Sequence, residues 1–143
     1  MSSSPFSKDD EQKIINAIAE AESGTSGEIR VHIDKYCKTD PLLKARNLFA
    51  NFKMNETELR NGVIIYISLN DKKLAIFGDK GINEKVEEGF WDSTLQCMKS
   101  HFESGDFVNG IIAGLKESGN KLKLHFPKSN NDINELPDEI SFG

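Results

Sequence analysis

The chain has 143 residues, the usual length of one compact domain, and at this length it can bury a sizeable core without disulfides or metals. Its formal net charge of -5 excludes a broad nucleic-acid footprint, because such a surface needs an excess of basic residues. The hydrophobic content of 37% and the charged content of 29% indicate a folded rather than a disordered chain.

Cysteine usage and the absence of apolar segments predict the compartment. Cys37 and Cys97 are the only cysteines, and they are not arranged as CxxC, so we expect neither a disulfide framework nor a thiolate zinc site. The first residues, MSSSPFSKDDEQK, lack the apolar core of a signal peptide. No apolar run is long enough to cross a bilayer. We therefore expect a cytoplasmic monomer with free thiols and no contact with membranes.

The first half of the chain predicts a helix, a strand and a second helix. Ser7 can cap a helix in which isoleucines recur at helical spacing. Residues Glu28–Asp34 then alternate apolar and polar side chains, as a half-buried strand does. Asp40 followed by Pro41 is typical of a helix start, and apolar residues continue at helical spacing as far as Phe52.

The second half predicts a hairpin and two further helices. Residues 62–69, GVIIYISL, form a continuous apolar run, which indicates a strand buried on both faces. After the turn NDKK, residues 74–78 return as the second arm of a hairpin. We expect one helix from about Asn83 to Phe102 and another from a cap at Asp106 to the HFP that ends at Pro127.

This order of elements predicts an α/β fold, namely a three-layer αβα sandwich with a small mixed central sheet of about four strands. Any fourth strand must be short. We expect a single domain over residues 1–127. Residues 128–143 are expected to form a polar, acidic tail on the surface, with apolar anchors at Ile133, Leu136, Ile140 and Phe142.

The predicted strand directions bring two loops to one edge of the sheet. A helical connection makes the strands at 28–34 and 62–69 parallel, whereas the tight turn makes 74–78 antiparallel to its neighbour. The end of the third strand therefore lies beside the start of the first. We expect the loops Glu22–Glu28 and Gly78–Lys85 to meet there.

The two loops are rich in carboxylates and other oxygen donors. Carboxylates crowded at one place repel each other unless a positive charge lies among them. An all-oxygen surrounding suits a hard divalent cation, and calcium tolerates irregular loops better than magnesium does. The sequence therefore predicts a divalent metal site, with calcium preferred and magnesium as the second choice, whose ligands are Glu22, Glu28, Asp79, Asn83 and Glu84.

Other interpretations of the same loops stay open. Glu28 and Glu84 can be solvated or paired with Lys80 or Lys85, with Asp79 as a turn residue that bonds local amides. A phosphate loop is less favoured, because GDKGINEK lacks the final Lys-Ser/Thr pair of the Walker motif and no GxGxxG is present.

Four motifs in order resemble the TPM domain family. GEIRV at 27–31 is similar to the family's entry into its first strand, and NGVIIYISLNDKK at 61–73 is similar to its hairpin. GDKGI at 78–82 fills the place of the family's turn with one extra residue. FESGDFVNG at 102–110 is similar to the motif before its last helix. The resemblance runs from about residue 8 to 125.

The resemblance implies an αβα sandwich in a stand-alone domain, with Glu28 and Asp106 at the family's acidic positions. It also implies two kinds of function. One is acid phosphatase activity, which is associated with a plant member, and the other is a role as an assembly or accessory factor. The tail after Pro127 lies outside the resemblance.

The residues themselves favour binding over catalysis. Cys37 is not followed by a CxxxxxR phosphatase signature, and Asp34 is not part of a DxD pattern. His32 is expected on the polar, solvated side of its strand. Asp106 is expected to cap a helix rather than to act in catalysis, although it can lie near Asp34 or other acids at the opposite sheet edge. We therefore expect a cation-binding domain with a regulatory or interactive role, and metal-assisted phosphatase activity is the alternative.

Overall fold

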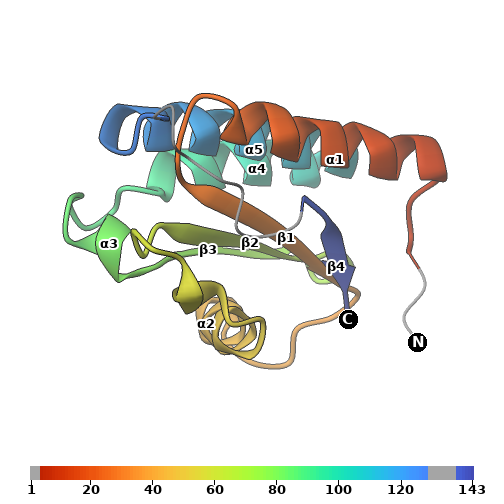
Figure 1. Cartoon of the computed structure of the whole chain (residues 1–143). Coiled ribbons are helices and arrows are strands. Elements are labelled where there is room, and N and C mark those ends of the chain that lie inside the picture. Colours follow the sequence, from red (N-terminus) through yellow and green to blue (C-terminus); the bar gives the residue numbers. More distant parts are fainter. Residues whose placement is uncertain (1–3, 129–137) are drawn as a thin grey trace.

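The computed structural model describes residues 4–128 and 138–143. A mixed sheet of four strands in the order β3-β2-β1-β4 lies between two layers of helices (Figure 1). β1 is parallel to both β2 and β4, and β3 is antiparallel to β2. The predicted α/β sandwich and its strand directions are confirmed. The strands are β1 (Glu28–Asp34), β2 (Gly62–Ser68), β3 (Lys73–Gly78) and β4 (Ile140–Phe142).

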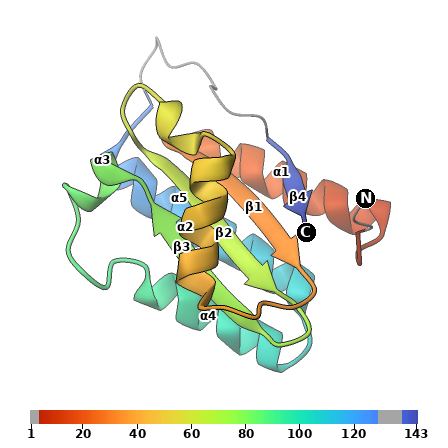
Figure 2. The same cartoon turned by 90° about the horizontal axis from the view of Figure 1, so that it is seen from below.

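The helices cover the two faces of the sheet unequally. One face carries α1 (Lys8–Glu22), α4 (Asp92–Glu103) and α5 (Phe107–His125), whereas α2 (Pro41–Asn51) crosses the other face (Figures 1 and 2). The 3-10 turn η1 (Met54–Glu56) follows α2, and the one-turn helix α3 (Lys80–Asn83) follows β3. The larger core therefore lies under the three long helices.

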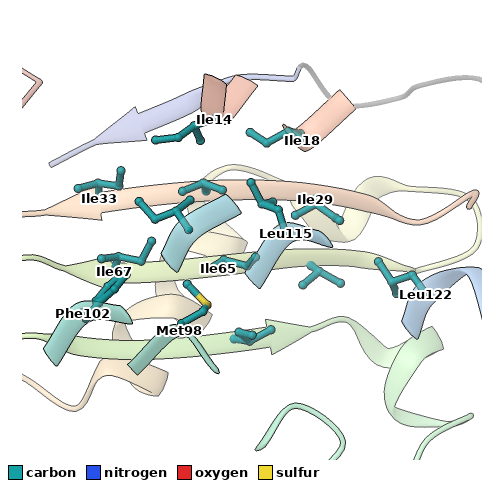
Figure 3. Close-up of a cluster of buried hydrophobic side chains, with 14 of the residues drawn as sticks. Ile14, Ile18, Ile29, Ile33, Ile65, Ile67, Met98, Phe102, Leu115 and Leu122 are labelled. Carbon is teal, nitrogen blue, oxygen red and sulfur yellow. The ribbon is translucent and has the colours of Figure 1, made fainter. Parts of the chain in front are cut away.

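Alternation along β2 divides the apolar side chains between two cores. Val63, Ile65 and Ile67 point into the core under α1, α4 and α5, and Ile64 and Tyr66 point toward α2. All seven residues of β2 are buried, as the continuous apolar run predicts. Figure 3 shows the larger core, in which the labelled side chains are Ile14, Ile18, Ile29, Ile33, Ile65, Ile67, Met98, Phe102, Leu115 and Leu122.

Capping residues begin α1 and α2 where the sequence predicts them. The Ser7 hydroxyl accepts the Asp10 N–H at 3.1 Å, and the Asp40 carboxylate accepts the Leu43 N–H at 3.0 Å with Pro41 in the first turn. Each cap satisfies a backbone donor that the helix itself leaves without a partner.

The prediction of one helix from Asn83 to Phe102 is wrong. α3 ends at Asn83 and α4 begins only at Asp92, with a non-helical segment between them. Gly89 in this segment has φ of 83°, which is incompatible with a right-handed helix. Apolar spacing alone did not reveal the interruption, because Val86 and Trp91 still pack against the same core.

The C-terminal segment supplies the fourth strand. Ile140 and Phe142 pair with β1 and pack against the larger core, so two of the predicted anchors are confirmed and the strand is short. The other two, Ile133 and Leu136, lie outside the described residues. No helix in the described ranges combines the length and the apolar character that crossing a bilayer requires.

Candidate functional site

The loop from Ser23 to Gly27 is fastened to the end of α5. The Ser26 N–H donates to the Phe126 carbonyl at 2.9 Å, and Thr25 pairs with Pro127 in an isolated β-bridge. The Thr25 hydroxyl also donates to the Phe126 carbonyl and accepts the Gly27 N–H at 3.0 Å. These bonds fix the turn that separates Glu22, at the end of α1, from Glu28, at the start of β1.

Glu22, Glu28 and Asp138 form an acidic corner beside this turn. Glu22 and Glu28 are only 8% and 3% exposed, and Asp138 hydrogen-bonds the Glu22 carboxyl from the segment that leads into β4. The Ile29 N–H donates to Glu22 Oε2 at 2.7 Å. Asp138 belongs to the predicted tail, so sequence reasoning missed it. Its position depends on β4 pairing with β1, which no local pattern in the sequence indicated.

The electrostatics of the acidic corner favour a bound proton. Burial, which is the largest cause, acts together with the hydrogen bond and charge of Asp138 and the charge of Glu28 to raise the pKa of Glu22 to about 9. The Ile29 N–H opposes this shift because it stabilises the carboxylate. At neutral pH Glu22 therefore holds a proton, which it can donate to Asp138.

Asp79 lies at the same end of the sheet but is paired with a positively charged side chain, that of Arg60. Arg60 donates two hydrogen bonds to Asp79, with Nε 2.8 Å from Oδ2 and one terminal nitrogen, Nη2, 3.0 Å from Oδ1. Asp79 Oδ1 also accepts the Lys80 N–H at 2.7 Å and so caps α3. The bond to Asp79 raises the pKa of Arg60, and sequence reasoning did not identify this partner.

The remaining predicted ligands lie with Asp79 rather than with Glu22. Asn83 donates its side-chain amide to the Gly78 carbonyl at 3.2 Å. Glu84 is exposed and lies 3.8 Å from Lys80 Nζ. Pairing of Glu84 with Lys80 was one of the open interpretations, and it is what the structure contains.

The two loops lie at the same end of the sheet, as predicted, but they do not meet, because the start of β2 lies between them. Asn61 accepts the Glu28 N–H at 3.4 Å, and the next residue, Gly62, accepts the Asp79 N–H at 3.0 Å. Two strand spacings therefore separate the backbones of Glu28 and Asp79, which is about 10 Å. Within residues 4–128 and 138–143, no three or more His, Cys, Asp or Glu side chains are grouped closely enough to hold a metal ion.

A second polar cluster, the His32 chain, consists of Ser141, His32, Asp34 and Tyr66 on the face covered by α2. His32 Nδ1 lies 2.8 Å from the Ser141 hydroxyl oxygen, and Nε2 lies 2.8 Å from Asp34 Oδ1. Tyr66 donates to Asp34 Oδ2 at 2.6 Å. Burial lowers the pKa of His32, and burial together with the bond to Asp34 raises that of Tyr66.

The expectation that His32 is a surface histidine is wrong, since it is 4% exposed. Its ring stacks on Tyr66, with centroids 5.9 Å apart, and lies at the same distance from Phe52. Alternation placed His32 on the correct face, but Phe52, which follows α2, and Ser141 of β4 cover it there. The His32 chain fastens β4 to β1, because Ser141 belongs to β4.

Asp106 caps α5 and is exposed. Its Oδ1 accepts the Asn109 N–H at 3.4 Å, and its Oδ2 accepts the Asn109 side-chain amide at 3.0 Å. The predicted role as a helix cap is confirmed. Both carboxylate oxygens of Asp106 thus bond to the first turn of its own helix.

The fold and the site together define a class of protein: a small αβα domain with an acidic corner at one end of its mixed sheet. Residues 3–121 match the TPM domain family, so the chain belongs to this family. No curated protein sequence matches the chain.

Two solved structures resemble the chain. The NMR structure of BA42 protein from the psychrophilic bacterium Bizionia argentinensis is 41% identical, with a TM-score of 0.91, and the match covers 100% of this chain and 99% of that one. The N-terminal domain of the cg2496 protein from Corynebacterium glutamicum is 12% identical, with a TM-score of 0.65, and the match covers 95% of this chain and 80% of that one. The second likeness concerns the fold alone.

Proposed function

We propose that this TPM domain binds a divalent cation at the acidic corner and has a regulatory or interactive role with a protein partner rather than a catalytic one. The observation that supports the proposal is the convergence of Glu22, Glu28 and Asp138 from three different segments, with Glu22 and Glu28 buried. Such crowding is unfavourable unless a proton or a cation reduces the repulsion. The two free cysteines support a reducing, cytoplasmic setting.

Calcium is the cation that we favour, and magnesium is the second choice. The three carboxyl groups, as they are placed in the structure, are not grouped closely enough to hold a metal ion. Binding therefore requires that they shift toward one another and that water and backbone carbonyls complete the coordination. Calcium accepts a variable number of oxygens in irregular geometry, whereas magnesium requires an octahedron. Asp79 is already neutralised by Arg60, Glu84 faces Lys80, and Asn83 bonds to the Gly78 carbonyl. We therefore do not include these three residues among the proposed calcium ligands.

The test is to titrate cation-free protein with calcium and with magnesium. Binding is monitored by the NMR chemical shifts of the backbone amides and by calorimetry. We expect shifts in residues 22–29 and around Asp138, with release of a proton from Glu22 when calcium binds, because the cation takes the place of that proton. Calorimetry in buffers of different ionisation enthalpy measures this release. Amide shifts confined to residues 79–84 would move the site to the second loop, and no shifts at either loop would overturn the proposal.

Matched variants sharpen the test. Glu28→Gln should weaken calcium binding, whereas Glu84→Gln, which removes the same charge from the other loop, should leave it unchanged. Glu22→Gln should abolish proton release.

The structure gives little support to phosphatase activity, because the residues considered for it are engaged in structural contacts. Asp34 is bonded to His32 and Tyr66, Asp106 caps α5, and Cys37 is buried. Each group considered for phosphoryl chemistry thus has a structural role. Turnover of a generic phosphomonoester that disappears in Asp106→Ala would reverse this ranking.

A further inference from the structure

The outer edge of β3 borders a groove of about 390 Å³. β3 is an edge strand, since β2 is its neighbour on one side and the sheet ends on the other. The start of α2 and the segment from Asn83 to Asp92 form the remaining walls. Figure 2 shows this segment passing outside β3 on its way to α4.

The backbone of β3 offers hydrogen bonds to this groove. The Asp79 N–H donates to Gly62, so the antiparallel ladder makes Asp79 and then every second residue back along β3 face β2. Leu74 and Ile76 therefore direct their N–H and C=O groups away from β2, and both line the groove. Throughout the described ranges, no backbone group of another element bonds to these two residues.

The walls of the groove combine apolar side chains with negative charge. Leu42 is 50% exposed, and Leu74, Trp91 and Leu95 continue the apolar surface. The described lining contains no lysine or arginine. Its acidic members are exposed and take part in no ion pair found in the described chain: Asp40, Glu87, Glu88 and Asp92.

We propose that this groove binds an extended peptide segment of a partner protein, in which basic and apolar residues alternate, as an additional strand on β3. Backbone pairing with Leu74 and Ile76 supplies binding, and side chains on alternate faces meet the apolar wall and the acidic rim. The proposal gives a location to the interactive role proposed above, but it requires no cation.

The charge of the groove also selects among occupants. A second copy that paired edge to edge would bring its own Glu87 and Glu88 toward those of the first copy. Like charges at such an interface are unfavourable, whereas a basic peptide is attracted to the same rim. The groove therefore favours a basic segment of another protein over self-association.

The test uses the whole chain and a short blocked peptide of alternating lysine and valine. We expect amide shifts in β3 and new protection of the Leu74 and Ile76 amides from hydrogen exchange. Glu87→Lys combined with Glu88→Lys should weaken binding about tenfold, since attraction is replaced by repulsion at two exposed charges. The matched control, Glu56→Lys with Glu103→Lys, changes net charge equally but lies away from the groove and should have little effect.

Two further peptides separate strand pairing from general charge attraction. N-methylation of every second backbone amide blocks one edge of the peptide, so one of the two possible patterns should bind and the other should not. Equal binding of both patterns, or no binding at millimolar peptide, would overturn the proposal. Concentration-dependent dimerisation that protects Leu74 and Ile76 would overturn it as well, because the occupant would be a second copy.

The outcome is independent of the cation site, because the peptide titration is run with and without calcium. Peptide binding without calcium binding would support the groove and reject the acidic corner. Calcium binding without peptide binding would do the reverse.

Discussion

Asp79 and Glu22 are buried carboxyl groups at the same end of the sheet, yet the fold neutralises them differently. Asp79 is 4% exposed, and its two carboxylate oxygens accept hydrogen bonds from Nε and Nη2 of Arg60. Glu22 is 8% exposed and faces two other carboxyl groups, so it retains a proton. A buried acid is therefore a candidate cation site only where no positive side chain of the protein is already bonded to it.

Asp34 represents a third way to bury an acid. Its two oxygens lie 2.8 Å from His32 and 2.6 Å from Tyr66, and neither partner requires a charge to donate. Arginine, a proton and neutral donors therefore each stabilise one carboxyl group within a single small domain. Four predictions test this comparison.

The largest expected effect is the pH dependence that Glu22 confers in cation-free buffer. Its pKa is about 9 in the folded protein against an ordinary 4.5, so its contribution to stability is greatest below pH 4.5 and is lost as pH rises toward 9. The slope reaches about 1.4 kcal/mol per pH unit. Urea unfolding across this range should show the slope in the wild type and its loss in Glu22→Gln. Parallel curves for the two proteins would contradict the assignment.

Tyr66→Phe should lower the free energy of unfolding by about 1–3 kcal/mol, because a buried carboxylate oxygen of Asp34 loses its donor. Denaturant unfolding measures this loss. Tyr36→Phe is a suitable control, since Tyr36 is 64% exposed. An unchanged midpoint for Tyr66→Phe would show that Asp34 does not depend on this bond.

Asp79→Asn should lower the melting temperature by a few degrees. We expect this decrease to be smaller than the decrease in melting temperature that Tyr66→Phe causes. The substitution keeps the shape and the cap of α3 but removes the charge that Arg60 binds, and Arg60 itself reaches solvent. Calcium affinity should stay at the wild-type value. A large loss of calcium affinity would instead place Asp79 among the ligands.

The smallest effect is expected for Glu84→Gln. The Lys80–Glu84 pair spans one helical turn with both side chains more than half exposed, so its removal should cost less than about 0.5 kcal/mol. Thermal unfolding at low and high salt is the measurement. A salt-sensitive change larger than this would indicate that Glu84 has a second partner.

Much of the fold could be predicted from local patterns. Alternation in Glu28–Asp34 and the apolar run of β2 were sufficient to locate these two strands. The helical connection between them and the tight turn before β3 were sufficient for the strand directions. The caps at Ser7, Asp40 and Asp106 were predictable because a capping bond spans only three residues. The placement of the two loops at the same end of the sheet followed from the strand directions alone.

The contents of the site were less predictable, because they depend on contacts between distant segments. Arg60 reaches Asp79 only because the start of β2 lies beside α3, and Asp138 reaches Glu22 only because β4 pairs with β1. His32 was placed on the correct face of its strand, but its burial depends on Phe52 and on Ser141 of β4.

Local patterns were enough to predict β1, β2 and β3, the starts of α1, α2 and α5, and the end of the sheet where the acidic loops lie, since each depends on spacing within one segment or on the direction of a connection. The position of β4 was not among these predictions. Which buried carboxyl group is paired with a positively charged side chain depends instead on tertiary contacts. That choice depends on strand order and register, which bring Arg60 to Asp79 and leave Glu22 among other acids. Free energies of burial and pairing depend on these long-range neighbours, and a local pattern does not contain them.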